Sequence, residues 1–335
     1  MPETAKDGGV ILRELNSGGW RWAAVKGLVS VGVPEQLKDG PLSVTELAER
    51  CGAHAPTLAR LLRSVAATGL LRTVGPGTYE LTGPGQALLH SPALYAIQYN
   101  LDPEISRALS DIGEIVRTGR SPFTERHGSV YDYLAADPDS LSAVAFDKLM
   151  TANHGPLAAQ LAQASEFESM RTLVDVGGGV GTFLAAILAA HPDLRGTLVE
   201  LERAVPKAKE YLSTQGVGGQ AEVVAGDFFE SLPAAADAYL LAHIIHNWDD
   251  ARAVRILRTV RDAIPADGTL MLVEVLLPDD DSPHPGKDLD VLLSALHFGK
   301  ERGTSEYNAL FAEAGFVPGP VTHLAQGTCL ITATP

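Results

Sequence analysis

The chain has 335 residues, of which 45% are hydrophobic and 20% are charged, a composition typical of globular protein with one large domain or two smaller ones. Its formal net charge is −15 and its isoelectric point is near 5.0. An acidic molecule repels phosphate backbones, so the composition disfavours nucleic-acid binding unless a local basic patch overrides it.

Cysteine usage and hydropathy bear on the compartment. Cys51 and Cys329 lie far apart and follow neither metal-binding nor redox spacing, which is typical of a reducing compartment. Residues 1–7 have mixed charge and lack the apolar core of a signal peptide, and no uninterrupted apolar run reaches about 18 residues. We therefore expect a cytoplasmic protein that does not span a membrane.

The first 95 residues show helices followed by a pair of strands. An apolar helical pattern over residues 9–33, interrupted by the glycine pair 18–19, comes first. A capping box begins a short helix over residues 43–52, and a proline in a first turn begins another over residues 56–69. Gly75-Pro-Gly77 then separates two short segments, which is a hairpin signal. This order predicts a winged helix-turn-helix.

A winged helix has two plausible uses. Arg60, Arg63 and Arg72 could meet DNA phosphates, whereas the alternative is a protein-interaction module. Residues 41–90 contain four Arg or Lys against three Asp or Glu, a net charge of about +1. Nucleic-acid binding needs a stronger basic surface than this. Dimerisation is therefore the favoured function.

Residues 95–165 are predicted to be mainly helical, with turns at 119–122 and 136–139. Phe146-Asp-Lys-Leu-Met150 begins a longer helix that leads into the next strand. Aromatic and methionine side chains at such spacing are most often core residues. Met150 is nevertheless a candidate for the wall of a pocket, because it lies just ahead of a cofactor-type turn.

The segment Thr172–Phe183 reads as a buried strand, a glycine turn and a helix. A β-branched run ends at Val176, glycines follow at 177, 178, 179 and 181, and an apolar helical pattern begins at Phe183. Such a turn exposes backbone amides to a ligand. A dinucleotide fingerprint would have glycine where Thr182 stands. The G-x-G-x-G spacing behind Asp175 resembles instead the S-adenosylmethionine motif of class I methyltransferases, with a generic tight turn as the alternative.

Four further strands are predicted after this turn, alternating with helices as in a parallel sheet. With the first, their ends carry polar residues: Asp175, Glu200, Asp227, His246 and Glu274. Ligands of open α/β sheets bind beyond the carboxyl ends of the strands. Any one of these residues could be a cap or a solvated turn residue, but the whole set predicts a ligand crevice.

Three of these residues have predicted roles. Glu200 lies where doubly wound folds place the acid that accepts ribose hydroxyls. Asp227 and Phe228 offer an acceptor and an aromatic face for an adenine, although Phe228 could equally be core. His246, just before a helix over residues 251–263, is a candidate general base, because imidazole titrates near pH 6.5 and can take a proton as a phenol attacks.

The motifs Leu173-Val-Asp-Val-Gly-Gly-Gly-x-Gly, Gly226-Asp-Phe-Phe, His246-Asn-Trp-Asp-Asp and Gly299-Lys-Glu-Arg302 resemble those of caffeate-type small-molecule O-methyltransferases, and the bacterial natural-product branch looks most similar. The resemblance implies an α/β fold. Its core is a Rossmann-like, doubly wound class I methyltransferase sheet, joined to an N-terminal winged-helix dimerisation domain. It implies a dimerisation domain over residues 1–95 and a catalytic domain over 96–335, with a helical connector to 165 and the sheet from 166.

The resemblance also implies the site residues and their roles. His246 matches the family's base, and Glu274 and Glu301 match two acids that flank and orient it. Residues implied to bind S-adenosylmethionine are Asp175, Gly177, Gly179, Glu200, Leu201, Gly226, Asp227, Phe228 and His243. Residues implied to line the acceptor pocket are Met150, Asn247, Trp248, Leu293, His297 and Phe298. No metal is expected.

Two segments depart from the family pattern. Ala242-His243 stands where members often have Lys or Arg, which bears on one cofactor contact. Leu296–Gly303 lacks the proline of plant members, which bears on the substrate wall.

The expected reaction is transfer of a methyl group to the hydroxyl of a small aromatic natural product by a homodimer. No nucleic-acid or membrane partner is expected. N-methylation, hydroxylation or rearrangement by a divergent family member, and a winged-helix regulator, remain as alternatives.

Overall fold

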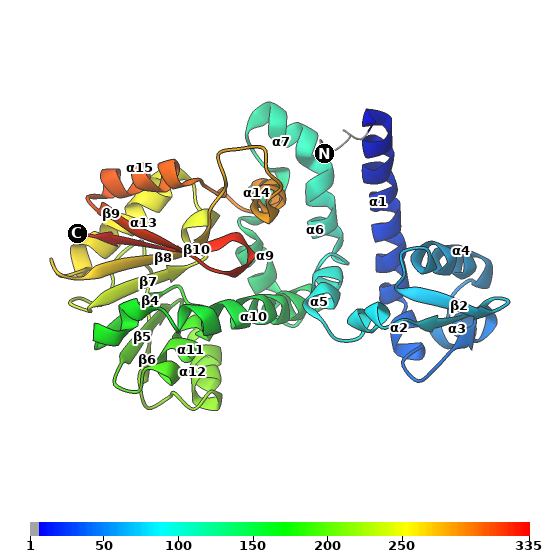
Figure 1. Ribbon diagram of the computed structural model, residues 1–335, viewed down its shortest axis with the longest axis horizontal. Coiled ribbons are helices and arrows are strands. Elements are labelled where there is room, and N and C mark those ends of the chain that lie inside the picture. The colour runs from blue at the N-terminus through cyan, green and yellow to red at the C-terminus, as the bar shows by residue number, and fades with distance from the viewer. Residues whose placement is uncertain (1–6) are drawn as a thin grey trace, which may run out of the picture. The chain divides into compact units, whose positions relative to one another are not determined.

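In the computed structural model, residues 7–335 are described and divide into two compact units (Figure 1). The first contains the chain up to Ser106 together with Leu134–Met150, and the second contains Arg107–Tyr133 and Thr151–Pro335. Most of the N-terminal segment used to predict the absence of a signal peptide, residues 1–6, lies outside the described residues. Within residues 7–335, no helix combines the length and apolar character needed to cross a membrane.

The first unit begins with helices and a small antiparallel sheet. Its elements are α1 (Gly8–Ser30), α2 (Val33–Gln36), β1 (Leu42–Ser43), α3 (Val44–Cys51), α4 (Ala55–Ala66), β2 (Leu71–Gly75), β3 (Thr78–Leu81) and α5 (Pro92–Tyr99). The predicted capping box is present, since the Ser43 side chain accepts from the Glu46 amide and Glu46 accepts from the Ser43 amide. Gly52 ends α3 with a φ of 61°. The strands pair in the order β1-β3-β2.

The helix predicted over residues 9–33 is present as α1, which runs through Gly18 and Gly19 without a break and ends at Ser30. Glycine lowers helix stability by about 1 kcal/mol per residue but does not prevent the backbone hydrogen bonds from forming. Buried Leu28 and Val29 fix the C-terminal end of the same helix in the core of the first unit.

Three helices contain residues of both units: α6 (Pro103–Ala108), α9 (Val130–Ala136) and α10 (Leu141–Leu161). The long helix predicted from Phe146 is α10, which begins five residues earlier, at Leu141. The remaining helices belong to the second unit: α7 (Ile112–Thr118), α8 (Pro122–His127), α11 (Thr182–Ala190), α12 (Val205–Thr214), α13 (Asp250–Ala263), α14 (Pro285–Leu296) and α15 (Thr304–Ala314).

The second unit is built on a seven-stranded sheet, counted over the described residues, with the order β6-β5-β4-β7-β8-β10-β9. The strands are β4 (Thr172–Val176), β5 (Arg195–Glu200), β6 (Ala221–Ala225), β7 (Ala238–Ala242), β8 (Thr269–Val275), β9 (Val317–His323) and β10 (Thr328–Thr334). The first five are parallel, and β10 and β9 add antiparallel pairs at one side. The order reverses between β5-β4 and β7, which is where doubly wound sheets bind ligands.

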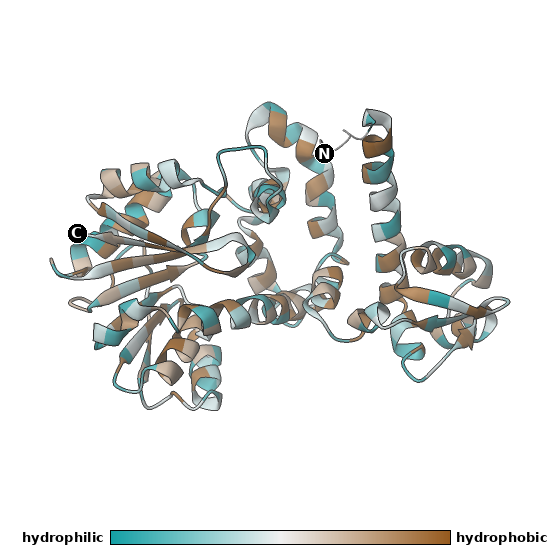
Figure 2. Ribbon diagram, in the orientation of Figure 1, coloured by the Kyte–Doolittle hydropathy of each residue, from teal (hydrophilic) through white to brown (hydrophobic). Residues whose placement is uncertain are grey.

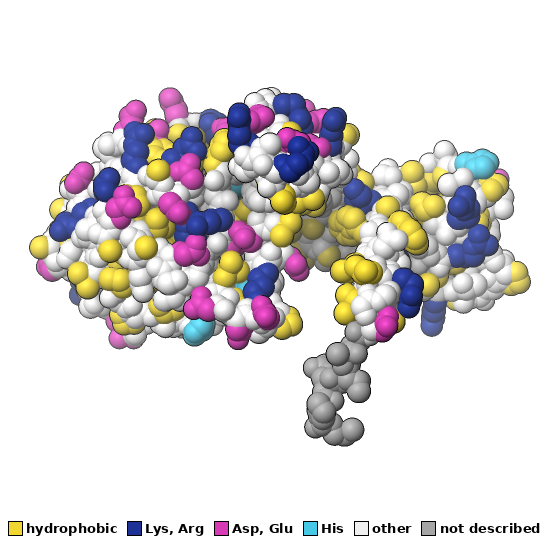
Figure 3. Space-filling view, turned by 90° about the horizontal axis from the view of Figure 1, so that it is seen from above, with side chains coloured by type: hydrophobic (Ala, Val, Ile, Leu, Met, Phe, Trp, Pro, Cys, Tyr) yellow, Lys and Arg dark blue, Asp and Glu magenta, His cyan; other side chains and the backbone are white. Residues whose placement is uncertain are grey.

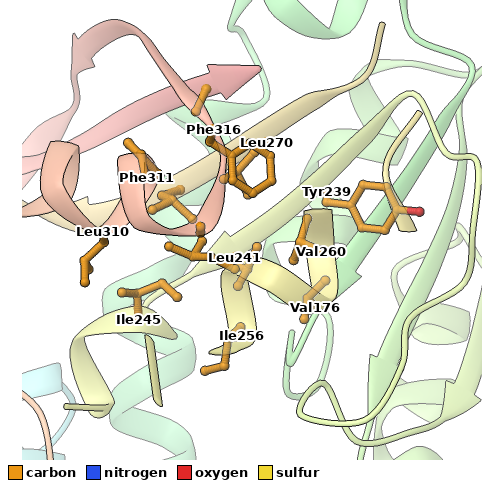
Figure 4. Close-up of a cluster of buried hydrophobic side chains, with 14 of the residues drawn as sticks. Val176, Tyr239, Leu241, Ile245, Ile256, Val260, Leu270, Leu310, Phe311 and Phe316 are labelled. Atoms are coloured by element: carbon orange, nitrogen blue, oxygen red, sulfur yellow. The ribbon is translucent and has the colours of Figure 1, made fainter. Parts of the chain in front are cut away.

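Helices cover both faces of this sheet. Tyr239 and Leu241 of β7 pack in one core with α13 and α15, and Figure 4 shows them among the side chains of that cluster. Ala238 and Leu240 alternate with them and pack in a second core with α11, α12 and the end of α10. A strand buried on both faces needs continuous apolar sequence, as 238–242 has.

Two sequence expectations about the sheet are corrected. The strand predicted over residues 237–246 ends at Ala242, and His246 lies in a short 3-10 turn, Ile245–Asn247, because the backbone turns at His243 with a φ of +55°. The antiparallel hairpin β9–β10 was not predicted. Pro318 and Pro320 obscure its first strand, which is tolerated because β9 is an edge strand.

Candidate active site

The glycine turn after β4 depends on close packing as well as on backbone freedom. Gly177 has a φ of +68°, and a Cβ there would lie 2.9 Å from Ile244 Cδ1 and 3.1 Å from Phe228 Cε1. A Cβ on Gly178 would lie 2.2 Å from an Asp175 carboxylate oxygen. Gly179 has a φ of +61° in open space, so only its conformation requires glycine.

Asp175 is a fully buried acid at the fourth position of β4. Within the described chain, neither carboxylate oxygen has a hydrogen-bond partner. Burial, reinforced by the nearby charge of Glu200, raises the pKa of Asp175 to about 7, and a contact with the Leu184 backbone amide, whose geometry falls short of a hydrogen bond, opposes that shift. A buried carboxyl without partners is costly to ionise, so a ligand that donates hydrogen bonds here would be strongly favoured.

Glu200 ends β5 beside the glycine turn. Its carboxylate accepts from the amides of Leu201, at 2.9 Å, and Gly179, at 3.3 Å. Burial raises its pKa, and the two amide hydrogen bonds oppose that shift. The turn and this acid, predicted separately from the sequence, are therefore joined in one site.

The segment after β6 brings aromatic side chains to the same region. A Cβ on Gly226 would lie 3.0 Å from Val199, so glycine permits close approach of the chain to β5. Asp227 accepts from the Phe229 amide at 2.8 Å. The Phe228 ring meets that of Trp248 edge-on at 6.2 Å. Trp248, predicted to line the acceptor pocket, thus packs beside the aromatic face predicted for an adenine.

His243 occupies the turn between β7 and the 3-10 helix. Its amide donates to Val273 O at 2.9 Å, and its ring stacks on that of His154 at 4.9 Å with an interplanar angle of 4°. Burial, and then the charges of His154 and His246, lower the pKa of His243 well below its ordinary value. It is therefore a neutral imidazole at neutral pH.

His246 is oriented by two carboxylates that have different contacts. Its Nδ1 donates to Glu301 Oε1 at 3.0 Å, whereas Glu274 Oε2 lies 3.7 Å from the same nitrogen. Glu274 Oε1 instead accepts from the backbone amides of Ile245, at 2.8 Å, and His246, at 3.4 Å. Glu301 orients the ring, and Glu274 fixes the turn that carries it.

The electrostatics distinguish His246 from the histidines around it. Burial alone would lower the pKa of His246, but the charge of Glu274 and the hydrogen bond to Glu301 raise it above its ordinary value. Burial lowers the pKa of His154 to about 4 and of His297 to about 3, with the charge of His246 adding to both shifts. Among these imidazoles, His246 is the one arranged to accept a proton.

The ionised form of Glu274 is disfavoured in this buried site. Burial raises the pKa of Glu274 to about 7, the charge of His246 opposes the shift, and the charge of Glu301 adds to it. Glu274 Oε2 and Glu301 Oε2 are buried and have no hydrogen-bond partner within the described chain. Two buried acids around one imidazole stabilise its protonated form.

The loop 297–303 approaches the turn that carries His246 closely because residue 299 is glycine. A Cβ on Gly299 would lie 2.1 Å from His246 O and 2.4 Å from the Trp248 amide nitrogen. This contact places Glu301 next to the imidazole.

The residues predicted for the acceptor pocket have varied environments. Asn247 donates from Nδ2 to His243 O at 2.9 Å, while its Oδ1 is buried without a partner in the described chain. Leu293 is buried on α14, and His297, just after that helix, has a buried Nδ1 that also lacks a partner there. Phe298 is 37% exposed. Met150 belongs to the first compact unit, so its role in the pocket stays a prediction.

Sequence reasoning missed three residues of this region. The Tyr131 ring meets that of His297 edge-on at 5.3 Å, and its hydroxyl hydrogen-bonds the Asn247 side chain. His154 stacks on His243, and Arg302 donates a hydrogen bond to Ile245 O in the turn that carries His246. Tyr131 and His154 carry no motif signal. Arg302 belongs to the Gly-Lys-Glu-Arg motif, in which only the glutamate was assigned a role.

Within residues 7–335, the ligand atoms of His243, His246 and Glu274 lie within 4.8 Å of one another, close enough together that they could hold a metal ion. The same three groups are engaged in the hydrogen bonds and the stacking described above. The prediction that no metal takes part therefore stays a prediction.

Comparison with protein families gives two matches. A model of the O-methyltransferase domain matches residues 109–317, and one of the O-methyltransferase dimerisation domain matches residues 14–91.

Two curated relatives show the range of acceptors. The chain is 34% identical over 343 residues to the phenazine O-methyltransferase PhzM of Lysobacter antibioticus, with 100% of both proteins covered. It is 32% identical over 290 residues to the 8-amino-8-demethylriboflavin N,N-dimethyltransferase of Streptomyces davaonensis, covering 85% of this chain and 83% of that protein.

Two solved structures are similar over nearly the whole chain. The mitomycin 7-O-methyltransferase MmcR has a TM-score of 0.91 and 33% identity, with 97% of each chain covered. The O-methyltransferase NcsB1 from neocarzinostatin biosynthesis, solved with S-adenosylmethionine and 2-hydroxy-5-methyl naphthoic acid, has a TM-score of 0.82 and 30% identity, with 93% of this chain and 95% of that chain covered.

Proposed function

Because the chain belongs to the O-methyltransferase family, we propose that it methylates a phenolic hydroxyl of a small aromatic natural product in bacterial secondary metabolism, with His246 as general base. The predicted family is confirmed, and so is the α/β fold class with its mostly parallel sheet and N-terminal dimerisation domain; the enzyme uses S-adenosylmethionine as methyl donor. The observation that carries the proposal is the His246 imidazole, which donates from Nδ1 to Glu301 at 3.0 Å.

The residues of the β4 turn fit S-adenosylmethionine. Asp175 offers two buried acceptor oxygens without partners in the described chain, and Gly177 and Gly179 keep side chains out of the turn above it. Glu200 would hold the ribose hydroxyls, and the segment Gly226–Phe228 would hold the adenine. Leu201 and His243 complete the proposed cofactor contacts. When bound, the cofactor supplies a sulfonium methyl group for in-line displacement by the acceptor oxygen.

The chain's own residues would then manage the proton. With its Nδ1–H donated to Glu301, His246 has Nε2 available to accept the proton of the attacking hydroxyl. Its raised pKa lies closer to that of a phenol, so proton transfer is less uphill. The carboxylates of Glu301 and Glu274 stabilise the imidazolium that forms. No free phenolate is required before the reaction.

The acceptor pocket is proposed to include Asn247, Trp248, Leu293, His297 and Phe298. Asn247 Oδ1 and His297 Nδ1 are buried polar atoms without partners in the described chain, which supports an acceptor that carries polar groups as well as an aromatic ring. The acceptors in the names of the relatives, a phenazine and a naphthoate among them, are aromatic molecules of this kind.

The test is methyl transfer from labelled S-adenosylmethionine to a panel of phenolic acceptors. Replacement His246→Gln is expected to lower kcat by roughly 100- to 10,000-fold while cofactor affinity, measured by calorimetry, stays within about threefold. Equal turnover of the variant and the wild type would remove the base assignment and leave catalysis to proximity alone.

Methylation of nitrogen is the second candidate, because the riboflavin-type relative is named as an N,N-dimethyltransferase. Matched phenol and aniline acceptors, with the products identified by mass spectrometry and NMR, separate the two reactions. A hydroxyl acceptor gains most from a base, since its proton must leave during transfer, and the His246–Glu301 pair supports that reaction.

We also propose that residues 1–95 form a dimerisation domain and residues 96–335 the catalytic domain. The dimerisation match at residues 14–91 supports this division. Figure 2 shows brown, hydrophobic segments along α1. Large apolar side chains of this helix are exposed, namely Ile11, Leu12, Leu15, Trp20 and Trp22. Leu12→Glu is expected to convert a homodimer to monomers in light scattering, and a wild-type monomer would contradict the proposal.

Nucleic acid is not proposed as a partner, and a winged-helix fold for residues 1–95 stays a prediction. Acidic and basic side chains are interspersed over the face of the second unit visible in Figure 3, which supports the proposal that nucleic acid is not a partner. Cys51 and Cys329 are free thiols, which supports a reducing, cytoplasmic location.

A further inference from the structure

Arg302 carries a charge that is completely removed from solvent. Its side chain is 0% exposed, and charged side chains are almost never fully buried unless they are paired. Its charge is matched by Asp250, whose Oδ1 accepts from Nε at 3.0 Å and from Nη2 at 2.7 Å. A buried ion pair by itself adds little stability, so the other hydrogen bonds of Arg302 decide what this residue contributes.

Two further hydrogen bonds of Arg302 bind the backbone on both sides of His246, and Nη1 also donates to Lys300 O at 3.4 Å. Nη1 donates to Ile245 O at 3.2 Å, immediately before the histidine, and Nη2 donates to Trp248 O at 2.8 Å, two residues after it. A planar guanidinium fixes the relative positions of its acceptors. The 3-10 turn that carries the base is therefore fixed at both ends by one side chain.

The backbone of Arg302 is fixed at the end of β8, the strand that carries Glu274. Arg302 forms a parallel bridge with Leu276, and Arg302 O accepts from the Leu277 amide at 3.1 Å. The preceding residue is Glu301, the acceptor of the His246 Nδ1–H. One residue thus connects the base, its orienting carboxylate and the strand of the second carboxylate.

We propose that Arg302 is a positioning residue for methyl transfer: by binding the backbone before and after His246, it sets the distance and direction of the His246–Glu301 hydrogen bond. This inference rests on the proposed base role of His246. It differs from a purely structural role, because loss of Arg302 would disturb one hydrogen bond and the chemical step while leaving the cofactor turn, which lies on other strands, in place.

The test compares Arg302→Gln and Arg302→Lys with Arg258→Gln, an exposed arginine of α13 that forms a surface pair with Glu313. Arg302→Gln is expected to lower kcat by roughly 100-fold with little change in the KM for S-adenosylmethionine, since a displacement of about 1 Å has that effect on an aligned site. Arg302→Lys keeps the charge but not the planar donors, so its kcat should lie about tenfold above that of the glutamine variant.

A readout that needs no acceptor is the NMR signal of the His246 Nδ1 proton. Hydrogen bonded to a buried carboxylate, this proton is expected to resonate far downfield in the wild type and in Arg258→Gln, and to shift upfield or disappear in Arg302→Gln. Its assignment follows from its loss in His246→Gln. This arm decides the proposal even if the wild type methylates none of the acceptors, in which case it is the proposed function that fails.

Asp250→Asn provides a variant that is expected to fold if Arg302→Gln does not, because the Asp250 side chain is 59% exposed. This variant weakens the hydrogen bonds between residue 250 and the Arg302 guanidinium, while the hydrogen bonds of Arg302 to Ile245 O and Trp248 O remain. We therefore expect kcat to fall by about 3- to 10-fold and the downfield signal of the His246 Nδ1 proton to broaden. The proposal is overturned if Arg302→Gln, or Asp250→Asn in its place, retains both the wild-type kcat and the downfield signal, or if Arg258→Gln loses as much activity.

Discussion

Replacement Glu301→Gln tests how much the charge on one orienting carboxylate contributes to catalysis. The wild-type carboxylate accepts from His246 Nδ1 at 3.0 Å and is 2% exposed. Under the proposed base role of His246, it becomes the partner of the imidazolium that forms. Gln has a similar shape and can still accept, so the variant removes charge with little change in packing. A hydrogen bond to a charged group contributes about 1.5–3 kcal/mol, which corresponds to a decrease in kcat of about 10- to 150-fold.

The pH dependence gives a second measurement of the same substitution. A base must be deprotonated to act, so the rate rises with pH through the pKa of His246. In the wild type, burial lowers the pKa of His246, but the charge of Glu274 and then the interactions with Glu301 raise it, and the net shift is upward. Glu301→Gln removes one of the raising groups, so the acidic limb of kcat/KM should move to lower pH.

The assay is initial-rate methyl transfer between about pH 5 and 9 with saturating cofactor. Glu313→Gln is the matched control, because Glu313 is an exposed acid of α15 whose ion-pair partner is Arg258. It should keep both the wild-type kcat and the wild-type acidic limb. A Glu301→Gln variant with kcat within about threefold of the wild type and an unmoved acidic limb would refute the assigned role of Glu301.

Three further outcomes are expected. The pKa of Asp175 is about 7 in the folded protein, against 3.8 for an unperturbed aspartate. This difference leaves the free energy of unfolding of the cofactor-free protein unchanged below about pH 4 and lowers it by up to about 4 kcal/mol above pH 7. Asp175→Asn should therefore gain stability relative to the wild type as pH rises from 4 to 7 in urea titrations, and a difference independent of pH would contradict the shift. Gly178→Ala places a Cβ 2.2 Å from Asp175 and should destabilise by about 1–3 kcal/mol, whereas Gly113→Ala in α7, with nothing within 4 Å, should be neutral or stabilising in the same titrations. Dialysis against EDTA should leave methyl transfer unchanged; activity that is lost and then restored by a divalent cation would show that the His243, His246 and Glu274 cluster holds a metal.

Local sequence signals determined much of the fold. The capping box at Ser43 and the continuous apolar run over β7 depend on neighbouring residues, so they can be read without knowledge of the rest of the chain. The hairpin β9–β10 could not be read in this way. Its first strand contains prolines that are tolerated only at the edge of a sheet, and edge position is a property of the assembled sheet.

For the site, the sequence alone predicted that Asp175, Glu200 and the segment that carries His246 would lie on one side of the sheet, because the carboxyl ends of parallel strands point the same way. The structure corrected the position of His246, which lies in the turn after β7 and not at the end of that strand. Tertiary structure decided how they work together. Glu301 and Glu274 look equivalent in the sequence, yet the approach of Gly299 to the turn that carries His246 brings one to the imidazole and leaves the other on the backbone. The contacts of Arg302 with that turn span more than 50 residues of sequence, a separation at which no local pattern carries information.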